Sequence, residues 1–263
     1  MTIPLQDLAA RLDDAVLNAT AIRQLTSDVE LTLEEAYAVQ RAGVALRAER
    51  ADYPVGVKLG FTSKAKAAQM GISDVILGTI TKSMQVEDGG SLDCAHLIHP
   101  RIEPEVAFRL GRDVDPDDPT SDYPLNATTE VAPAVEVIDS RYRNFTFSLQ
   151  DVVADNASAA GFAVGPWRAL HEVRDDLANA AVALEIDGQV AETGSTAAIL
   201  GDPLRALTAV KRLARRHRLA LSAGTIILAG AATAAAPLQA GSVIRATVAG
   251  LGQVAMRTEK RHG

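Results

Sequence analysis

The segment Val182-Ala183-Leu184-Glu185-Ile186-Asp187-Gly188-Gln189-Val190-Ala191 is the clearest local indication of how this chain folds. Its first five residues are mostly apolar, its last three include Val190 and Ala191, and Asp187-Gly188 lies between these two groups. This dipeptide favours the two-residue turn that joins neighbouring antiparallel strands, because both residues tolerate a positive φ. The sequence therefore predicts a β-hairpin.

Short apolar runs of the same kind continue on both sides of this hairpin, separated by Gly, Asp and Pro. They cover residues 55–61, 106–110, 134–138, 161–164, 225–228, 243–248 and 253–256. Runs of this length bounded by turn-forming residues favour strands.

Helices are predicted mainly at the N-terminus and once near the end of the chain. The first fifty residues favour two helices, and the second begins at Thr32, where Glu35 completes a capping box. A short helix is predicted over 63–70, and a late one opens at Asp202-Pro203 and ends near Arg216. Because strands and helices do not alternate regularly, we predict an α+β fold with a mixed, mostly antiparallel sheet, rolled or barrel-like.

The domain organisation predicted from the sequence is a single structural unit. Residues 1–52 form an N-terminal helical arm and residues 53–263 a β-roll domain that carries the catalytic site. The segment 111–130, rich in Asp, Pro, Ser and Thr, is interpreted as a long surface loop.

Composition excludes several classes of protein. The 263 residues are 48% hydrophobic with a net charge of −7, which argues against nucleic-acid binding, and no apolar run is long enough to span a membrane. The basic cluster over 211–218 is interpreted as the solvated side of the late helix. A lone cysteine, Cys94, and the lack of a signal-peptide pattern favour a cytoplasmic location.

Three acidic residues indicate a site for chemistry. Glu103 and Glu105 are two apart in a predicted strand, so their side chains leave the same face, and such close like charges need a cation or a shared proton. Glu136 lies in the otherwise apolar run 132–138, where an unpaired carboxylate costs roughly several kcal/mol. Three carboxylates on neighbouring strands would suit Mg²⁺ or Mn²⁺ better than Zn²⁺. Alternatively, Glu103 and Glu105 face solvent on an edge strand and Glu136 ends a strand.

Two basic residues lie close to these runs in the sequence. Lys58, between Val57 and Leu59, is predicted to point inward with the glutamates as counter-charges. Alternatively, it lies on an edge strand, where its charge prevents pairing with another chain. Arg141 directly follows the Glu136 run, where a loop could present it to an anionic substrate.

These residues resemble a known group within the fumarylacetoacetate hydrolase superfamily, the 2-keto-4-pentenoate hydratases and 4-oxalocrotonate decarboxylases. The likeness spans nearly the whole chain in the right order. It is carried by five segments: 56–64, with the pattern G-x-K-x-G-x-T-S; 99–105, His-Pro-Arg-Ile-Glu-Pro-Glu; Glu136; 152–158, Val-Val-Ala-Asp-Asn-Ala-Ser; and 229–233, Ala-Gly-Ala-Ala-Thr. Within the group, residues 136–145 are most similar to the decarboxylases.

The resemblance implies a fold like the C-terminal domain of fumarylacetoacetate hydrolase and a Mg²⁺- or Mn²⁺-dependent lyase that decarboxylates 2-oxo-3-hexenedioate in aromatic catabolism. It implies that Glu103, Glu105 and Glu136 bind the metal. It further implies catalytic roles for Lys58 and Asp155, and a set of residues that bind the 2-oxo acid: Leu59, Arg141, Ser158 and Thr233.

Alternatives to this function stay open on the sequence. They are a hydratase acting on 2-hydroxypenta-2,4-dienoate, an acylpyruvate-type C–C hydrolase, and a non-catalytic partner subunit. By analogy with the group, a homo-oligomer is expected, with a hydratase or decarboxylase as a possible partner. One departure affects the substrate prediction: Lys82 stands where the group commonly carries an aspartate.

Overall fold

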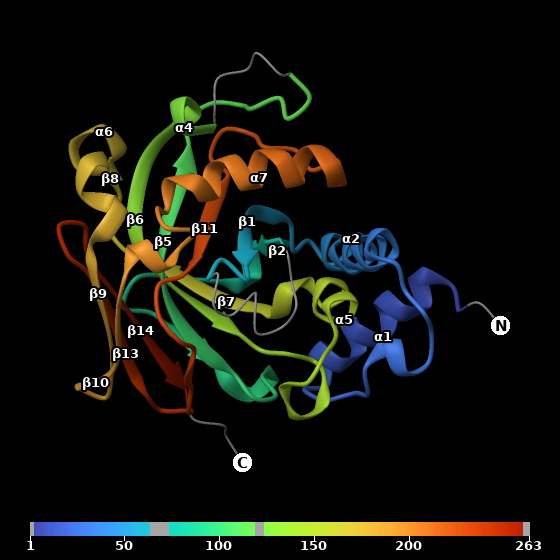
Figure 1. Ribbon diagram of the computed structural model, residues 1–263. Coiled ribbons are helices and arrows are strands. Elements are labelled where there is room, and N and C mark those ends of the chain that lie inside the picture. The colour runs from blue at the N-terminus through green and yellow to red at the C-terminus, as the bar shows by residue number, and fades with distance from the viewer. Residues whose placement is uncertain (1–2, 64–73, 119–123, 260–263) are drawn as a thin grey trace.

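The computed structural model describes residues 3–63, 74–118 and 124–259, apart from the side chains of 174 and 175. Most of its strands form one large sheet in the order β2-β1-β11-β5-β6-β7-β3, with β12 added to β5 and β8 added to β6 (Figure 1). The strands are β1 Pro54–Gly60, β2 Ile76–Thr81, β3 Gln85–Val86, β5 Arg101–Leu110, β6 Thr128–Ile138, β7 Ala159–Val164, β8 Arg168–Ala169, β11 Ile226–Ala231 and β12 Ala236–Pro237.

A second sheet has the order β10-β9-β13-β14-β4 and stands against the first at the left of Figure 1. Its strands are β4 Ser91–Asp93, β9 Ala181–Ile186, β10 Gln189–Ser195, β13 Val243–Val248 and β14 Gly252–Glu259. Between described strands, only β1–β11, β3–β7 and β4–β14 pair in parallel, so the mixed, mostly antiparallel sheet predicted from the sequence is confirmed.

Alternation along β5 and β6 gives each strand two different faces. Ile102, Val135 and Val137 belong to an apolar cluster with Leu184 and Met256 of the second sheet. Because successive side chains of a strand point to opposite faces, Glu103, Glu105 and Glu136 project to the other side. The second sheet thus packs on one face of these strands and leaves the acidic face on the opposite side.

Helices pack around the first sheet. The longer ones are α1 Leu5–Leu17, α2 Leu33–Glu49, α5 Leu149–Ala154 and α7 Leu204–His217, and the short ones are α4 Pro124–Ala127 and α6 Leu170–Val173. Helix α1 packs on α2 and α2 on α5, while α7 lies against β11, β1 and β2 (Figure 1). The 3₁₀ turns are Leu25–Ser27, Lys82–Met84, Cys94–His96, Arg143–Phe145, Asn156–Ser158, Arg174–Asn179 and Thr196–Ala198. No helix within these described ranges is both long and apolar enough to cross a membrane.

Predictions based on local signals are confirmed. Strands β9 and β10 form the hairpin, with φ of 52° at Asp187 and 77° at Gly188. The capping box at α2 forms as well, since the Thr32 side chain accepts from Glu35 N and the Glu35 carboxylate accepts from Thr32 N. Helix α7 begins one residue later than predicted, at Leu204. The arginines of the basic cluster lie on its outer side, whereas His217 is buried.

Other predictions fail or cannot be compared. The loop predicted over 111–130 is too long: α4 starts at Pro124 and β6 at Thr128, because β-branched Thr128 and Thr129 extend the strand beside Leu110. The edge-strand alternatives are wrong, since β5 lies between β11 and β6, and β1 lies between β2 and β11. The helix predicted over 63–70 falls almost entirely outside the described residues.

Candidate active site

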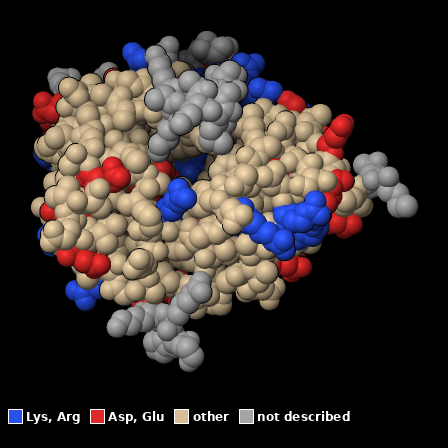
Figure 2. All heavy atoms as spheres, turned by 60° about the horizontal axis from the view of Figure 1, so that its bottom comes forward, with Lys and Arg blue, Asp and Glu red and all other residues tan. Residues whose placement is uncertain are grey.

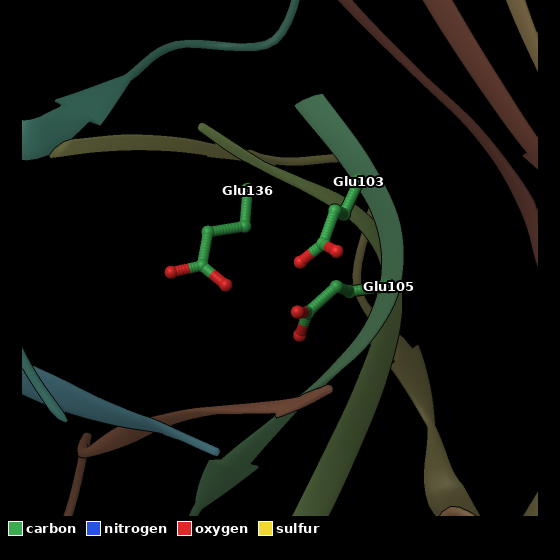
Figure 3. A group of neighbouring side chains, drawn as sticks. All are labelled: Glu103, Glu105 and Glu136. Atoms are coloured by element: carbon green, nitrogen blue, oxygen red, sulfur yellow. The ribbon is translucent and has the colours of Figure 1, made fainter. Parts of the chain in front are cut away.

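The pairing of β5 with β6 brings the three glutamates together. Glu103 lies directly opposite Glu136 in the ladder, and Glu105 follows two residues later on the same face. Each of the three offers a carboxylate oxygen within 4.8 Å of the other two. Figure 3 shows the three side chains pointing toward a common centre, two from β5 and one from the facing strand.

The carboxylates are buried, and the described residues satisfy those of Glu105 and Glu136 only in part. Glu105 and Glu136 are each 1% exposed, and Glu103 is 9% exposed. One oxygen of Glu105 accepts from Gly230 N at 2.8 Å, where a positive φ of 112° and contact with Thr62 leave no room for a side chain. The other Glu105 oxygen and Glu136 Oε2 have no hydrogen-bond partner among the described residues.

Lys58 from β1 is a cation that faces this cluster. Its Nζ lies 2.9 Å from Glu136 Oε1 and donates to the Ala157 carbonyl at 3.1 Å. Burial lowers the pKa of Lys58, but Glu136, Glu105 and Glu103 together outweigh burial and raise it, so the ammonium stays charged.

Among the described residues, three carboxylates share this cluster with one lysine. Burial and the neighbouring Glu136 raise the pKa of Glu105 well above its usual range, and burial together with Glu103 raises that of Glu136 against the effect of Lys58. One lysine therefore does not balance three carboxylates. Buried oxygens without donors, converging from two strands, are the donor set that a hard divalent cation binds, so the residues present fit Mg²⁺ or Mn²⁺.

A cavity of about 360 Å³ opens beside the cluster and is lined by Lys58, Leu59 and Glu103. Much of its remaining wall is apolar, formed by Phe61, Ile76, Ile138, Phe145, Phe147, Val152, Ala157, Ala231, Ala234 and Ala235. The cavity thus combines charged residues, Lys58, Glu103 and Arg101, with a mainly apolar wall, which suits a short organic acid.

The turn after α5 contributes to the same cavity. Asn156, Ala157 and Ser158 all have left-handed backbones, with φ of 52°, 52° and 59°. The Asn156 side chain accepts from Thr79 N at 2.7 Å and donates to Thr79 O at 2.8 Å, which fixes the turn to β2. The turn presents the Ala157 carbonyl to Lys58 and places the buried Ser158 hydroxyl, which has no hydrogen-bond partner among the described residues, at the cavity wall.

The structure places Asp155 and Arg141 behind this turn. The Arg141 guanidinium bonds to the Asp155 carboxylate and donates to the carbonyls of Asp139, Asp155 and Ala159, and both side chains are buried. Burial raises the pKa of Asp155 to about 6 against the effect of Arg141. Neither residue lines the cavity that holds Lys58 and Glu103.

Of the other residues singled out in the sequence, some line the cavity and some do not. Leu59 lines the cavity, whereas Thr233 lies between wall residues and donates to the Ala234 carbonyl at 2.8 Å. Lys82 is exposed at the end of β2, with Nζ 3.4 Å from Gln85 Oε1, and does not line the cavity. The roles assigned to Lys58, Asp155 and the substrate-binding residues stay predictions.

Sequence reasoning did not single out Arg101, Phe145 or Phe147, which all line the cavity. Arg101 offered a signal, since it is two residues before Glu103 and therefore on the same face of β5. The two phenylalanines offered none that periodicity could detect, because they lie in an irregular segment far from β5 in the sequence.

Comparison with known proteins agrees with this geometry. A 4-oxalocrotonate decarboxylase from Pseudomonas sp. is 49% identical over 95% of this chain and 96% of its own length, and one from Pseudomonas putida is 40% identical over 95% of each. Among solved structures, 4-oxalocrotonate decarboxylase from Pseudomonas putida G7, complexed with magnesium and adipate, matches 98% of this chain and 99% of its own with a TM-score of 0.91 and 38% identity. The fumarylacetoacetate (FAA) hydrolase C-terminal family matches residues 62–258, and the chain belongs to this family.

Proposed function

We propose that this protein decarboxylates 2-oxo-3-hexenedioate (4-oxalocrotonate) to 2-hydroxypenta-2,4-dienoate. The observation that carries the proposal is the buried cluster of Glu103, Glu105 and Glu136 beside Lys58, next to a mainly apolar cavity. The similarity to decarboxylases over nearly the whole chain supports it.

Glu103, Glu105 and Glu136 would hold Mg²⁺ or Mn²⁺ in this proposal. When bound, such an ion supplies a Lewis acid that stabilises negative charge on a carbonyl oxygen. Three carboxylates leave coordination positions for small oxygen ligands, and Mg²⁺ usually keeps several such positions outside the protein.

The reaction itself breaks one carbon–carbon bond. The C5–C6 bond breaks and C6 leaves as CO₂; its electron pair forms the C4=C5 bond, the C3=C4 pair moves to C2=C3, and the C2 oxygen gains the charge. That oxygen then takes up one proton to give the dienol. Lys58 is the residue proposed to donate a hydrogen bond to the C2 oxygen or the C1 carboxylate, because it is a buried cation that lines the cavity.

The cavity wall favours the loss of charge at C6. A carboxylate in apolar surroundings is poorly solvated, whereas neutral CO₂ is not penalised, so desolvation promotes the bond cleavage. Phe147, Ile138 and Val152 supply such surroundings away from the glutamates. Ser158 and Leu59 would contact the bound acid. Asp155 would act indirectly, by holding the turn 156–158 through its bond to Arg141.

The test incubates the purified protein with Mg²⁺ and 2-oxo-3-hexenedioate while CO₂ release and ultraviolet absorbance are followed. Release of CO₂ with appearance of the dienol is the expected result. Loss of the dienol absorbance of 2-hydroxypenta-2,4-dienoate without CO₂ would instead indicate a hydratase, and cleavage of an acylpyruvate a hydrolase. Inactivity with all three acids would favour a non-catalytic partner.

We also propose that residues 1–52 form an arm on a catalytic unit of residues 53–263, and that the protein acts in the cytoplasm as a homo-oligomer, with a hydratase as a candidate partner. Light scattering of the purified chain, alone and mixed with a hydratase of the same group, measures both associations. A monomer under all conditions would contradict the oligomer.

A further inference from the structure

Arg101 is a cation at the cavity wall that has no acidic partner among the described residues. It is exposed, and its guanidinium carbon lies 4.4 Å from the centre of the Phe145 ring. Within the described parts of the chain, no carboxylate lies within ion-pair distance of Arg101, and the Phe145 ring is the side chain on which its guanidinium rests. Its five donors are therefore open to a ligand.

The position of Arg101 relative to the glutamates follows from β5. Arg101, Glu103 and Glu105 occupy alternate positions of one strand and so share a face, and their exposure falls along the series from the rim inward. Two residues of a strand span about 6.6 Å, which is comparable with an extended six-carbon diacid. A diacid with one end at the glutamates can thus bring its other end to Arg101.

The aromatic ring beneath Arg101 is held in place. Phe145 has a left-handed backbone, with φ of 56°, and its ring contacts His99 at 5.2 Å and Phe147 at 5.8 Å between centroids. A strained backbone is retained where the surroundings fix it, often at a binding site. A guanidinium stacked on a fixed ring loses little further freedom when it binds an anion.

A second arginine on the same strand provides an internal comparison. Arg109 also lies over an aromatic ring, with 4.5 Å to the centre of Trp167, but its Nε donates to the Glu130 carboxylate at 2.6 Å. Arg109 is thus neutralised by Glu130, whereas no described carboxylate neutralises Arg101. Figure 2 shows a hollow with Lys or Arg atoms in it and beside it.

We propose that Arg101 selects substrates with a second carboxylate by binding that distal carboxylate at the rim of the cavity. The proposal rests on the proposed function for the identity of the substrate. Arg101 lies directly opposite Ile138 of the apolar wall, so its bond to the distal carboxylate partly offsets the desolvation by that wall. Because this carboxylate becomes neutral CO₂, its bond to Arg101 is strongest before the reaction. Arg101 therefore contributes to substrate binding rather than to the rate of the bond cleavage.

The experiment measures binding of adipate, a six-carbon diacid, and hexanoate, the matching monoacid, to the Mg²⁺-loaded protein by calorimetry. For Arg101→Gln, the Kd of adipate is expected to rise about 10- to 100-fold, as for loss of a charge-assisted pair. The Kd of hexanoate should change less than about threefold. Arg109→Gln, the matched control, should leave both constants unchanged.

A second variant and a kinetic readout keep the test decisive. Arg101→Lys keeps the charge but loses the planar fork, so an intermediate loss of adipate affinity is expected even if Arg101→Gln fails to fold. With the 2-oxo diacid, Arg101→Gln should raise KM without lowering kcat. Equal losses for the diacid and the monoacid, or no loss for the diacid, would overturn the proposal. Because binding is measured with unreactive acids, failure of the proposed reaction would be seen separately.

Discussion

Two buried ion pairs lie on either side of the turn 156–158, and they differ in how completely they are satisfied. Arg141 and Asp155 bond to each other, and the remaining Arg141 donors reach backbone carbonyls. Lys58 and Glu136 also meet, but two further carboxylates crowd the same site, and some of its buried oxygens have no donor within the described chain.

This difference indicates which pair belongs to the framework and which to the chemistry. A buried charge is tolerated at low cost when its hydrogen bonds are complete, and a satisfied pair has no capacity left for a ligand. An incompletely satisfied cluster costs stability unless a ligand completes it. We therefore interpret Arg141–Asp155 as a clamp that holds the turn, and Lys58 with the glutamates as the place where ligands bind.

The largest expected effect comes from replacing either of the two most deeply buried glutamates. Glu105→Gln or Glu136→Gln should lower Mg²⁺-dependent turnover by more than about a thousandfold, because the metal ligand set is lost. The fold should stay intact, since burial already penalises these charges. Turnover and thermal unfolding check this, with Glu130→Gln on the same strand β6 as the control. Full activity of both variants, or of the wild type in excess chelator, would contradict it.

Breaking the satisfied pair should instead damage the fold. Arg141→Met leaves Asp155 buried without its partner, which is expected to cost about 3–5 kcal/mol of unfolding free energy. Chemical denaturation measures this loss, and the exposed Arg143 provides the control through Arg143→Met. The double variant Arg141→Met/Asp155→Leu should recover part of the loss. A cost below about 1 kcal/mol would show that the pair does not clamp the turn.

Replacing Lys58 should lower activity more than stability, which is the opposite of the result expected for Arg141. Lys58→Met is expected to lower kcat by about 100- to 1000-fold, the usual effect of losing a donor to developing charge. Stability should fall far less than activity, because the variant also removes a desolvated ammonium. Kinetics and denaturation are compared with those of Lys82→Met, which changes an exposed lysine outside the cavity. If Lys58→Met instead unfolds the protein, Lys58 has a structural role and the predicted catalytic role is contradicted.

The smallest expected effect is the pH dependence of the folding stability that His217 contributes. Burial, then Arg216 and Arg41, lower the pKa of His217, which stacks on Tyr37, to about 4, against the effect of Glu34. In the unfolded chain this histidine gains its proton near the ordinary pKa of 6.5. Stability from His217 is thus full above that value and falls as the pH drops toward about 4.

Denaturation of His217→Gln and the wild type between about pH 7 and pH 4 measures this contribution as a difference. We expect the wild type to lose about 1–2 kcal/mol more than the variant over this range, after allowing for partial solvent screening. The exposed His171 gives the control, His171→Gln. Parallel pH profiles for His217→Gln and the wild type would contradict the assignment.

Sequence reasoning succeeded where the determining interactions are local. Asp187-Gly188 and the Thr32–Glu35 box act within a few residues, so the hairpin and the start of α2 could be predicted. The register that sets Glu103 opposite Glu136 could not, because it depends on pairing between β5 and β6 across a long connection. Hence the sequence left an edge strand open as an alternative.

Longer-range contacts also decide what individual polar residues do. Arg141 follows Glu136 closely in the sequence, yet its donors are taken by Asp155 and by carbonyls that only the fold brings near. Arg101 finds Phe145 rather than an acid for the same reason. Chain position alone does not tell whether a cation is satisfied by the protein or left for a ligand.

The most direct measurement is anomalous diffraction from crystals grown with Mn²⁺ and adipate. We predict one strong anomalous peak per chain, with an oxygen of Glu103, Glu105 and Glu136 each within about 2.0–2.6 Å of it. No peak at these three residues, while Mn²⁺ is bound elsewhere in the chain, would contradict the metal site on which the proposed function depends.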